Sequence, residues 1–181
     1  MLFLRFLIAP LLLIFSFYFT YSQTKSAGPI IEDFGKVFVV PQPDFPVDAS
    51  LTYKVVFDVT NTPDEKDKLN PYLETAARFL NMHAQNGIPA DQLEVAVVVH
   101  SAASKDIISN SAYQQRYGVG NPNEKLIEAL LKANTQIIFC GQSAQARGFP
   151  KEELIPGVQL ALSAMTALIQ LQGQDYKLIK F

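Results

Sequence analysis

The segment Leu93-Glu-Val-Ala-Val-Val-Val-His100 decides the fold class of this chain. It is almost continuously apolar, whereas a strand with one solvated face alternates apolar and polar residues. A strand that reads this way is buried on both faces, as in a parallel sheet covered by helices. Gln136-Ile-Ile-Phe-Cys140 repeats the pattern, and Tyr53-Lys-Val-Val-Phe-Asp-Val59 is a further β-branched and aromatic run. We expect these segments, with a short last strand from Tyr176 to Lys180, to form one mostly parallel sheet.

Helical patterns lie between the expected strands. Asn70-Pro71 supplies a cap and a first-turn proline, and Gly87 ends the helical spacing that follows. Asn121-Pro-Asn-Glu124 opens a second helix like a capping box. A final helix, apolar nearly all round, is expected from about Val158 to Gln172, in the core or in a subunit interface. This alternation predicts an α/β domain over residues 51–181, a three-layer α/β/α sandwich with right-handed crossovers.

The N-terminal residues differ in texture from this domain. One basic residue, Arg5, precedes an apolar run from Phe6 to Phe19, the pattern of a secretory signal peptide. The run is shorter than the roughly 20 residues of a membrane span. We therefore expect residues 1–22 to be cleaved, the mature protein to be periplasmic or secreted, and no membrane attachment to remain; an uncleaved anchor is the alternative. Residues 23–50 are proline-rich, which predicts an extended arm with at most one edge strand, over Lys36 to Val40.

Composition and charge argue against several classes of protein. The 181 residues contain 15 basic and 17 acidic side chains with no basic block, so no nucleic-acid partner is expected. Two histidines and one cysteine without clustered spacing do not suggest a protein-only metal site. Gly118-Val-Gly120 follows a polar segment and lacks the third glycine of a dinucleotide fingerprint. We expect neither a metal nor a cofactor.

Polar residues gather where three of the expected strands end. The first strand ends near Asp58 and is followed by Asn61, the second ends at His100, and the third ends at Cys140, followed by Gly141-Gln142-Ser143. Ligands of open α/β sheets bind beyond the carboxyl ends of the strands. If the strands are parallel, these residues share one edge, and we take them all as candidate site residues. His100 and Cys140 would then face one cavity, although direct contact requires adjacent strands.

Cys140 is the only cysteine, so the chain has no internal disulfide. Gly141 permits a tight turn, and Ser143 to Arg147 is expected to form a short helix. The dipole and N–H groups of that helix would favour the thiolate, as would Arg147. The opposite interpretation is an inert thiol packed beside Phe139, since cysteine is among the most buried residue types. Local sequence leaves both open.

Two neighbouring features are equally open. His100 is either a satisfied structural group or a residue that lines the site. The polar segment from Ser101 to Tyr117 joins a strand end to the next helix. A connection of this length at the ligand edge can act as a lid, and the alternative is a short solvated helix without function.

Together these residues resemble the DsrE/DsrF-like family of sulfur-handling proteins. The resemblance covers roughly Tyr53 to Phe181 and rests most on the valine run that ends in His100 and on Cys140-Gly-Gln-Ser143. It implies a three-layer α/β/α fold and homo- or hetero-oligomers, often trimers or hexamers. In the sulfurtransferase members the matching cysteine carries a persulfide and passes sulfur to a partner protein. That role falls here on Cys140, with His100 as a lining residue.

Three functional hypotheses follow. The first is an exported sulfur-binding protein or sulfurtransferase in which Cys140 is the catalytic nucleophile and a donor or acceptor protein is the partner. The second is a non-catalytic module that binds a small ligand at the strand ends or assembles through its final helix. The third is a monothiol redox protein, suggested by the Cys-x-x-Ser spacing of Cys140 and Ser143. The best-known family members act in the cytoplasm, so the export signal leaves the sulfur donor and acceptor open.

Overall fold

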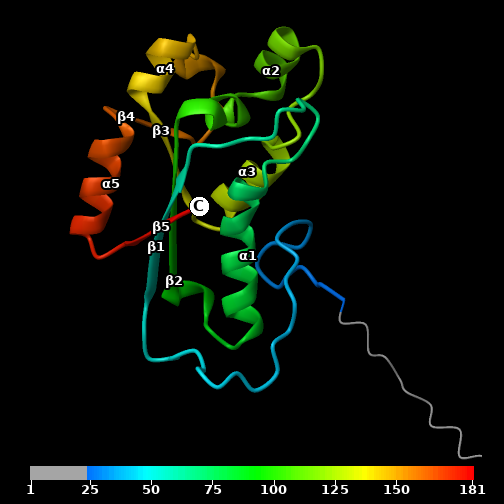
Figure 1. The fold of residues 1–181 in the computed structure, drawn as a ribbon, viewed down its shortest axis with the longest axis vertical. Helices are drawn as coiled ribbons and strands as arrows, with labels where there is room; N and C mark the ends of the chain where they lie inside the picture. The colour runs from blue at the N-terminus through cyan, green and yellow to red at the C-terminus, as the bar shows by residue number, and fades with distance from the viewer. Residues whose placement is uncertain (1–23) are drawn as a thin grey trace, which may run out of the picture.

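The computed structural model describes residues 24–181, so the predicted signal peptide lies outside the described residues. One five-stranded sheet forms the middle of the molecule (Figure 1). Its strands are β1 (Tyr53–Val59), β2 (Leu93–Val99), β3 (Gln136–Cys140), β4 (Gln159–Ala161) and β5 (Lys177–Lys180). They lie in the order β4-β3-β2-β1-β5, and every neighbouring pair is parallel.

The valine-rich segment lies at the centre of the sheet. β2 pairs with β1 on one side and with β3 on the other, so that Val99 lies between Val59 and Phe139. Val97 and Val98 point to opposite faces of the sheet, and both are fully buried. Burial on both faces explains why this strand is continuously apolar.

Helices cover both faces of the sheet, which confirms the predicted three-layer sandwich (Figure 1). On one face, α1 (Pro71–Gln85) and α3 (Glu124–Lys132) bury their apolar stripes, including Leu73 and Leu126, in the larger core. On the other face, α5 (Ala164–Gly173) packs Ala167 and its neighbours against β1, β2 and β3 in a smaller core. α4 (Gly141–Arg147) continues directly from the end of β3.

The helix starts follow the sequence signals to different extents. Asn70 caps α1 as predicted, because its side chain accepts a hydrogen bond from the N–H of Tyr72. The expected capping box of α3 is absent, since the helix begins at Glu124 after Asn123, whose side chain makes no capping bond. Asn121 instead accepts from the N–H of Asn123 and donates to backbone carbonyls of the preceding segment.

The connection between β2 and α3 is more deeply buried than its polar sequence suggests. It forms the 3₁₀ helix η2 (Ser101–Ile107) and then α2 (Asn110–Tyr117). Residues 103–108 are buried, with Ile107 and Ile108 fully enclosed in the larger core. The first half of this connection is therefore part of the core, which does not fit the lid interpretation.

The final helix was predicted to begin too early. Residues 159–161 form the edge strand β4 against β3, and α5 begins only at Ala164. Gly157 has a φ of +99°, which turns the chain into the strand, and the Ser163 side chain accepts from the N–H of Thr166 to cap the helix. Pairing at the sheet edge thus replaces the first part of the expected helix.

The arm lies along α1 rather than along the sheet. Val37 makes only an isolated antiparallel bridge to Ser26, so no edge strand forms over residues 36–40. The buried side chain of Asn81 bonds the backbone of Ile31 through both its oxygen and its nitrogen, which fastens the arm to α1. The remaining short elements are η1 (Ala90–Gln92) and η3 (Lys151–Glu153). Among the described helices, none has the length and apolar character that crossing a bilayer requires.

Candidate functional site

The carboxyl ends of β1, β2 and β3 place Asp58, His100 and Cys140 at one edge of the sheet. β2 and β3 are adjacent, and Val99 pairs with Phe139, so the next residues, His100 and Cys140, leave their strands at the same level. Neighbouring strands lie about 4.8 Å apart. The adjacency that direct contact requires is therefore present in the backbone.

The Cys140 thiol lies at the start of α4, packed against the smaller core with only 5% of the residue exposed. Burial raises the pKa of this thiol, but the N–H groups of Ser143, Ala164 and Gln142 and the hydroxyl of Ser143 outweigh it, so the pKa falls below its ordinary value. These donors favour the thiolate because they solvate its charge in place of water. The thiol is buried, as the inert interpretation expects, and its pKa is lowered, as the reactive interpretation expects.

Gly141 has a structural reason to lack a side chain. A Cβ at this position would lie 2.6 Å from the carbonyl oxygen of Ala161 and 3.1 Å from that of Leu162. The exposed side chain of Gln142 donates a hydrogen bond to the same Leu162 carbonyl, at 3.3 Å. α4 therefore lies close to the connection between β4 and α5, which leads into Ala164, one of the residues whose N–H lowers the pKa of the thiol.

The His100 ring is engaged away from the thiol. Its Nε2 lies 2.8 Å from Oδ1 of Asp58, and Oδ2 of that carboxylate, which is 5% exposed, lies 3.2 Å from Nζ of Lys180. A carboxylate only accepts hydrogen bonds, so Nε2 donates to Asp58, and Nδ1 lies within hydrogen-bond distance of the Ser101 hydroxyl at 3.1 Å. Both ring nitrogens have partners, so the ring is held in place and makes no hydrogen bond to Cys140. Asp58, His100 and Lys180 together form a polar wall beside the thiol.

A backbone contact links the histidine side of the site to the cysteine side. The N–H of Ser101, whose φ is +56°, donates to the hydroxyl oxygen of Ser143 at 3.2 Å. Ser143 therefore contacts both the thiol environment and the residue after His100. Asn61 does not join this group: it is exposed, and its carbonyl accepts from the side chain of Asn70 at 2.8 Å.

Sequence reasoning missed Lys180 and Ala164. The Lys180 contact depends on β5 lying beside β1, which no local pattern reveals. The position of Ala164 had a readable signal, because Ser163-Ala-Met-Thr166 resembles a helix start and places an N–H donor just after the cap. Arg147, expected near the thiolate, lies at the opposite end of α4 and lines a separate pocket.

A metal centre finds no support in the described part of the chain. Over residues 24–181, no three His, Cys, Asp or Glu side chains cluster closely enough to bind an ion. The arrangement around Cys140 is suited instead to thiolate chemistry: one nucleophilic sulfur, several N–H donors, and a fixed polar wall.

Comparison with known proteins shows the family of the chain. The sequence profile described as the DsrE/DsrF-like family matches residues 54–181, which include all the residues of the site. No curated protein sequence matches the chain.

Two solved structures are similar to this chain. One is a protein of unknown function, MTH1491, from Methanobacterium thermoautotrophicum, with 16% identity and a TM-score of 0.54. The other is the ychN protein from E. coli, with 21% identity and a TM-score of 0.53. Each match covers 71% of this chain and 99% of the other. At these identities the likeness establishes a shared fold alone.

Proposed function

The chain belongs to the DsrE/DsrF-like family, and we propose that it binds or transfers sulfur as a persulfide on Cys140. One observation carries the proposal: the only cysteine of the chain lies at the turn from β3 to α4, where N–H donors lower the pKa of its thiol. A sulfur carrier needs a thiolate to accept sulfur and a stabilised thiolate to release it. The same donors serve both steps.

The proposed reaction balances without an external oxidant. The Cys140 thiolate attacks the outer sulfur of a donor persulfide, R–S–SH, and the donor S–S bond breaks. The electron pair leaves with the donor as R–S⁻, and Cys140 becomes Cys–S–SH. An acceptor thiolate then attacks the outer sulfur of Cys140, the new S–S bond breaks, and the Cys140 thiolate returns. The N–H groups of Ser143 and Ala164 stabilise that leaving thiolate, which speeds release.

The polar wall beside the thiol has a positioning role in this proposal. Asp58 holds His100 through Nε2, and Lys180 holds the other carboxylate oxygen. This fixed group presents a charged and polar surface at the sheet edge, next to the Ser101–Ser143 contact.

Cyanolysis tests the proposal chemically. The protein is incubated with glutathione persulfide, freed of excess reagent, and treated with cyanide, which removes sulfane sulfur as thiocyanate. We expect about one thiocyanate per chain from the native protein and none from Cys140→Ser. Equal yields from the two proteins would refute the proposal.

A ligand-binding or assembly module without thiol chemistry is the second candidate. The 5% exposure of Cys140 favours it, because a donor molecule must reach the sulfur through a narrow opening. This candidate would be supported if Cys140 forms no persulfide and if loosening the structure with a mild denaturant does not speed the alkylation of its thiol. A stable glutathione adduct without sulfur release would instead support a monothiol redox protein.

We also propose that the protein forms a homo-oligomer, a trimer or hexamer, through α5. Leu162, Met165 and Ile169 are each 70% to 72% exposed and lie together at the start and outer side of this helix. Exposed apolar groups of this size on one face are typical of interaction surfaces. Because Gln142 bonds the carbonyl of Leu162, a subunit on this face would lie beside the thiol. Sedimentation of the native protein and of Met165→Glu tests this: a native monomer contradicts it.

Export is a further part of the proposal. The support is the basic residue and apolar run of residues 1–22, which precede the described residues. N-terminal sequencing of the protein recovered from the periplasm or medium should begin at Gln23. Recovery of the full-length chain in the cytoplasm would contradict it.

A further inference from the structure

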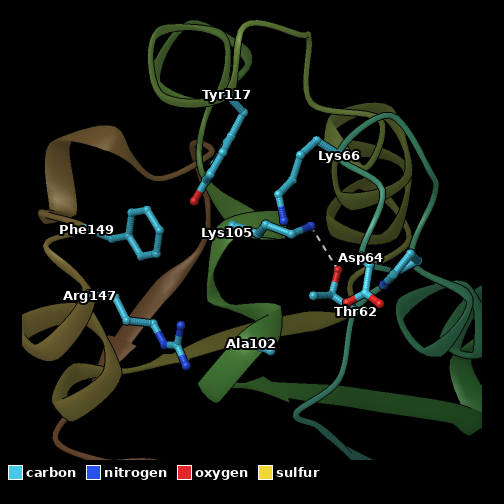
Figure 2. Close-up of a pocket in the computed structure, with 9 residues that line it drawn as sticks. Thr62, Asp64, Lys66, Ala102, Lys105, Tyr117, Arg147 and Phe149 are labelled. Atoms are coloured by element: carbon cyan, nitrogen blue, oxygen red, sulfur yellow. Dashed lines mark hydrogen bonds between the residues drawn. The ribbon is translucent and has the colours of Figure 1, made fainter.

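A cavity of about 420 Å³ lies between the connection from β1 to α1, η2, the end of α2 and the end of α4, and Figure 2 shows the residues that line it. The persulfide chemistry proposed above does not use it. Its lining includes Thr62, Lys66, Lys105, Tyr117, Arg147 and Phe149. The volume lies in the range of small-molecule sites, about 300 to 1,000 Å³. Three of these six residues are cationic and two are aromatic, which restricts what the cavity can hold.

Lys105 builds the floor of the cavity. Its buried ammonium pairs with Asp106, which is fully buried, and donates to the hydroxyls of Thr62 at 2.9 Å and Tyr113 at 3.3 Å. All three N–H donors of the ammonium therefore have protein partners. The charge of Lys105 is balanced by Asp106, and the network holds the floor rigid.

The charge offered to a ligand comes from Lys66 and Arg147. The ion pairs found within residues 24–181 include neither side chain. Asp64 is the one carboxylate in the lining of the cavity, so the two cations outnumber it. Figure 2 shows the Lys66 amine and the Arg147 guanidinium on opposite sides of one space, with Phe149 on the side of Arg147. An anion in that space would lie between two positive groups.

The aromatic residues supply the second part of the site. Tyr117 points its hydroxyl down into the cavity, and the Lys66 amine lies 5.7 Å from the centre of its ring (Figure 2). Phe149 is 5% exposed and held in place by the Arg116 guanidinium, 4.9 Å from its ring centre. Arg116 is itself paired with Glu153, so it adds little charge to the cavity. A flat apolar group would contact Tyr117 and Phe149 while its charged group met the two cations.

We propose that this cavity binds a small organic anion, a carboxylate or sulfonate carried on an apolar or aromatic body. The site is built before the ligand arrives, because the Lys105 network and the packing of Phe149 fix its floor and one wall. It is also mechanically joined to the thiol: α4 begins after Cys140 and ends at Arg147, about 10 Å away at 1.5 Å per residue. The proposal does not depend on sulfur chemistry at Cys140.

Backbone amide NMR with naphthalene-2-sulfonate as the probe tests the assignment. We expect saturable shifts of the signals of Ala102, Tyr117 and Phe149, and weaker binding at higher salt. The neutral analogue naphthalen-2-ylmethanol has the same ring without the charge, and it should bind at least about fivefold more weakly, as the loss of two exposed charge contacts implies. Shifts confined to α5, or equal affinity for the two compounds, would overturn the proposal.

Variants locate the charge that matters. Arg147→Gln and Lys66→Gln should each weaken sulfonate binding about threefold, and together about tenfold. Lys125→Gln removes an exposed charge from α3, away from the cavity, and serves as the matched control with unchanged affinity. Cys140→Ser should bind the probe as the native protein does, which separates this proposal from persulfide formation. Unchanged affinity in the double variant would refute the site.

Discussion

Replacing Ser143 by alanine should make the Cys140 thiol harder to ionise. Ser143 acts on the sulfur twice, through its backbone N–H and through its hydroxyl, and the substitution removes only the hydroxyl. The N–H donors of Gln142, Ala164 and residue 143 itself remain. We therefore expect the pKa of Cys140 to rise.

The size of the effect follows from the hydrogen bond that is lost. A hydrogen bond to a charged group contributes about 1.5 to 3 kcal/mol. The low end applies here, because the Ser143 oxygen also accepts from the N–H of Ser101 at 3.2 Å, so its hydroxyl is shared by two interactions. A loss of about 1.5 kcal/mol corresponds to a slightly more than tenfold lower thiolate fraction when the pH is below the pKa. The orphaned N–H of Ser101 adds about 1 kcal/mol of lost folding stability.

Ultraviolet absorbance of the thiolate, followed over pH, measures ionisation without depending on access to the buried sulfur. Because the chain has one cysteine, the corrected signal of native protein minus Cys140→Ser reports that thiol alone. Gln145→Ala, an exposed position on the same helix, is the matched control and should leave the titration unchanged. An unchanged or lower pKa in Ser143→Ala would refute the argument that these donors activate the thiol.

Three further outcomes can be measured by unfolding and titration. Asp106→Asn leaves the buried Lys105 ammonium without its counter-ion and should lower the free energy of unfolding in urea by about 3 to 5 kcal/mol. Glu94→Gln breaks an exposed pair with Lys54 and should cost much less; similar costs for the two variants would contradict this. Gly141→Ala places a Cβ 2.6 Å from a backbone carbonyl oxygen and should lower the melting temperature. Gly173→Ala has open space around the new Cβ and should not, and equal melting temperatures of the two variants would be inconsistent with the close approach. Folding lowers the pKa of Cys140, so the stability that its thiolate contributes is fully present above the unfolded pKa and is lost as the pH falls through the folded pKa. The difference in free energy of unfolding between the native protein and Cys140→Ser should therefore widen toward alkaline pH, and a constant difference would contradict the shift.

The sheet could be predicted because its central strands are apolar on both faces. Val97 and Val98 are fully buried in opposite directions, so their segment could not be mistaken for a half-solvated strand. β4 could not be predicted in the same way. It is three residues long, and Leu160 is 42% exposed at the sheet edge. A short apolar run of this kind does not distinguish a strand from a helix.

The candidate site could be predicted from the sequence only in part. Strand ends are readable from the sequence, and the structure does place Asp58, His100 and Cys140 at one edge. Side-chain partners are not readable, because they depend on strand order and on how each ring or amine turns. Lys180 reaches Asp58 only because β5 lies next to β1, and His100 then turns toward that carboxylate. The cavity beside Lys66 is likewise formed by segments that are distant in sequence.

The most direct test of the account is the intact mass of the protein after reaction with a stoichiometric persulfide donor. We predict a mass increase of one sulfur atom on Cys140, located by peptide mapping, which disappears when a thiol acceptor is added and the free thiol returns. Cys140→Ser should show no increase under the same conditions. A native protein that gains no sulfur, although its thiol is shown to be reduced and the fold intact, would contradict the central claim.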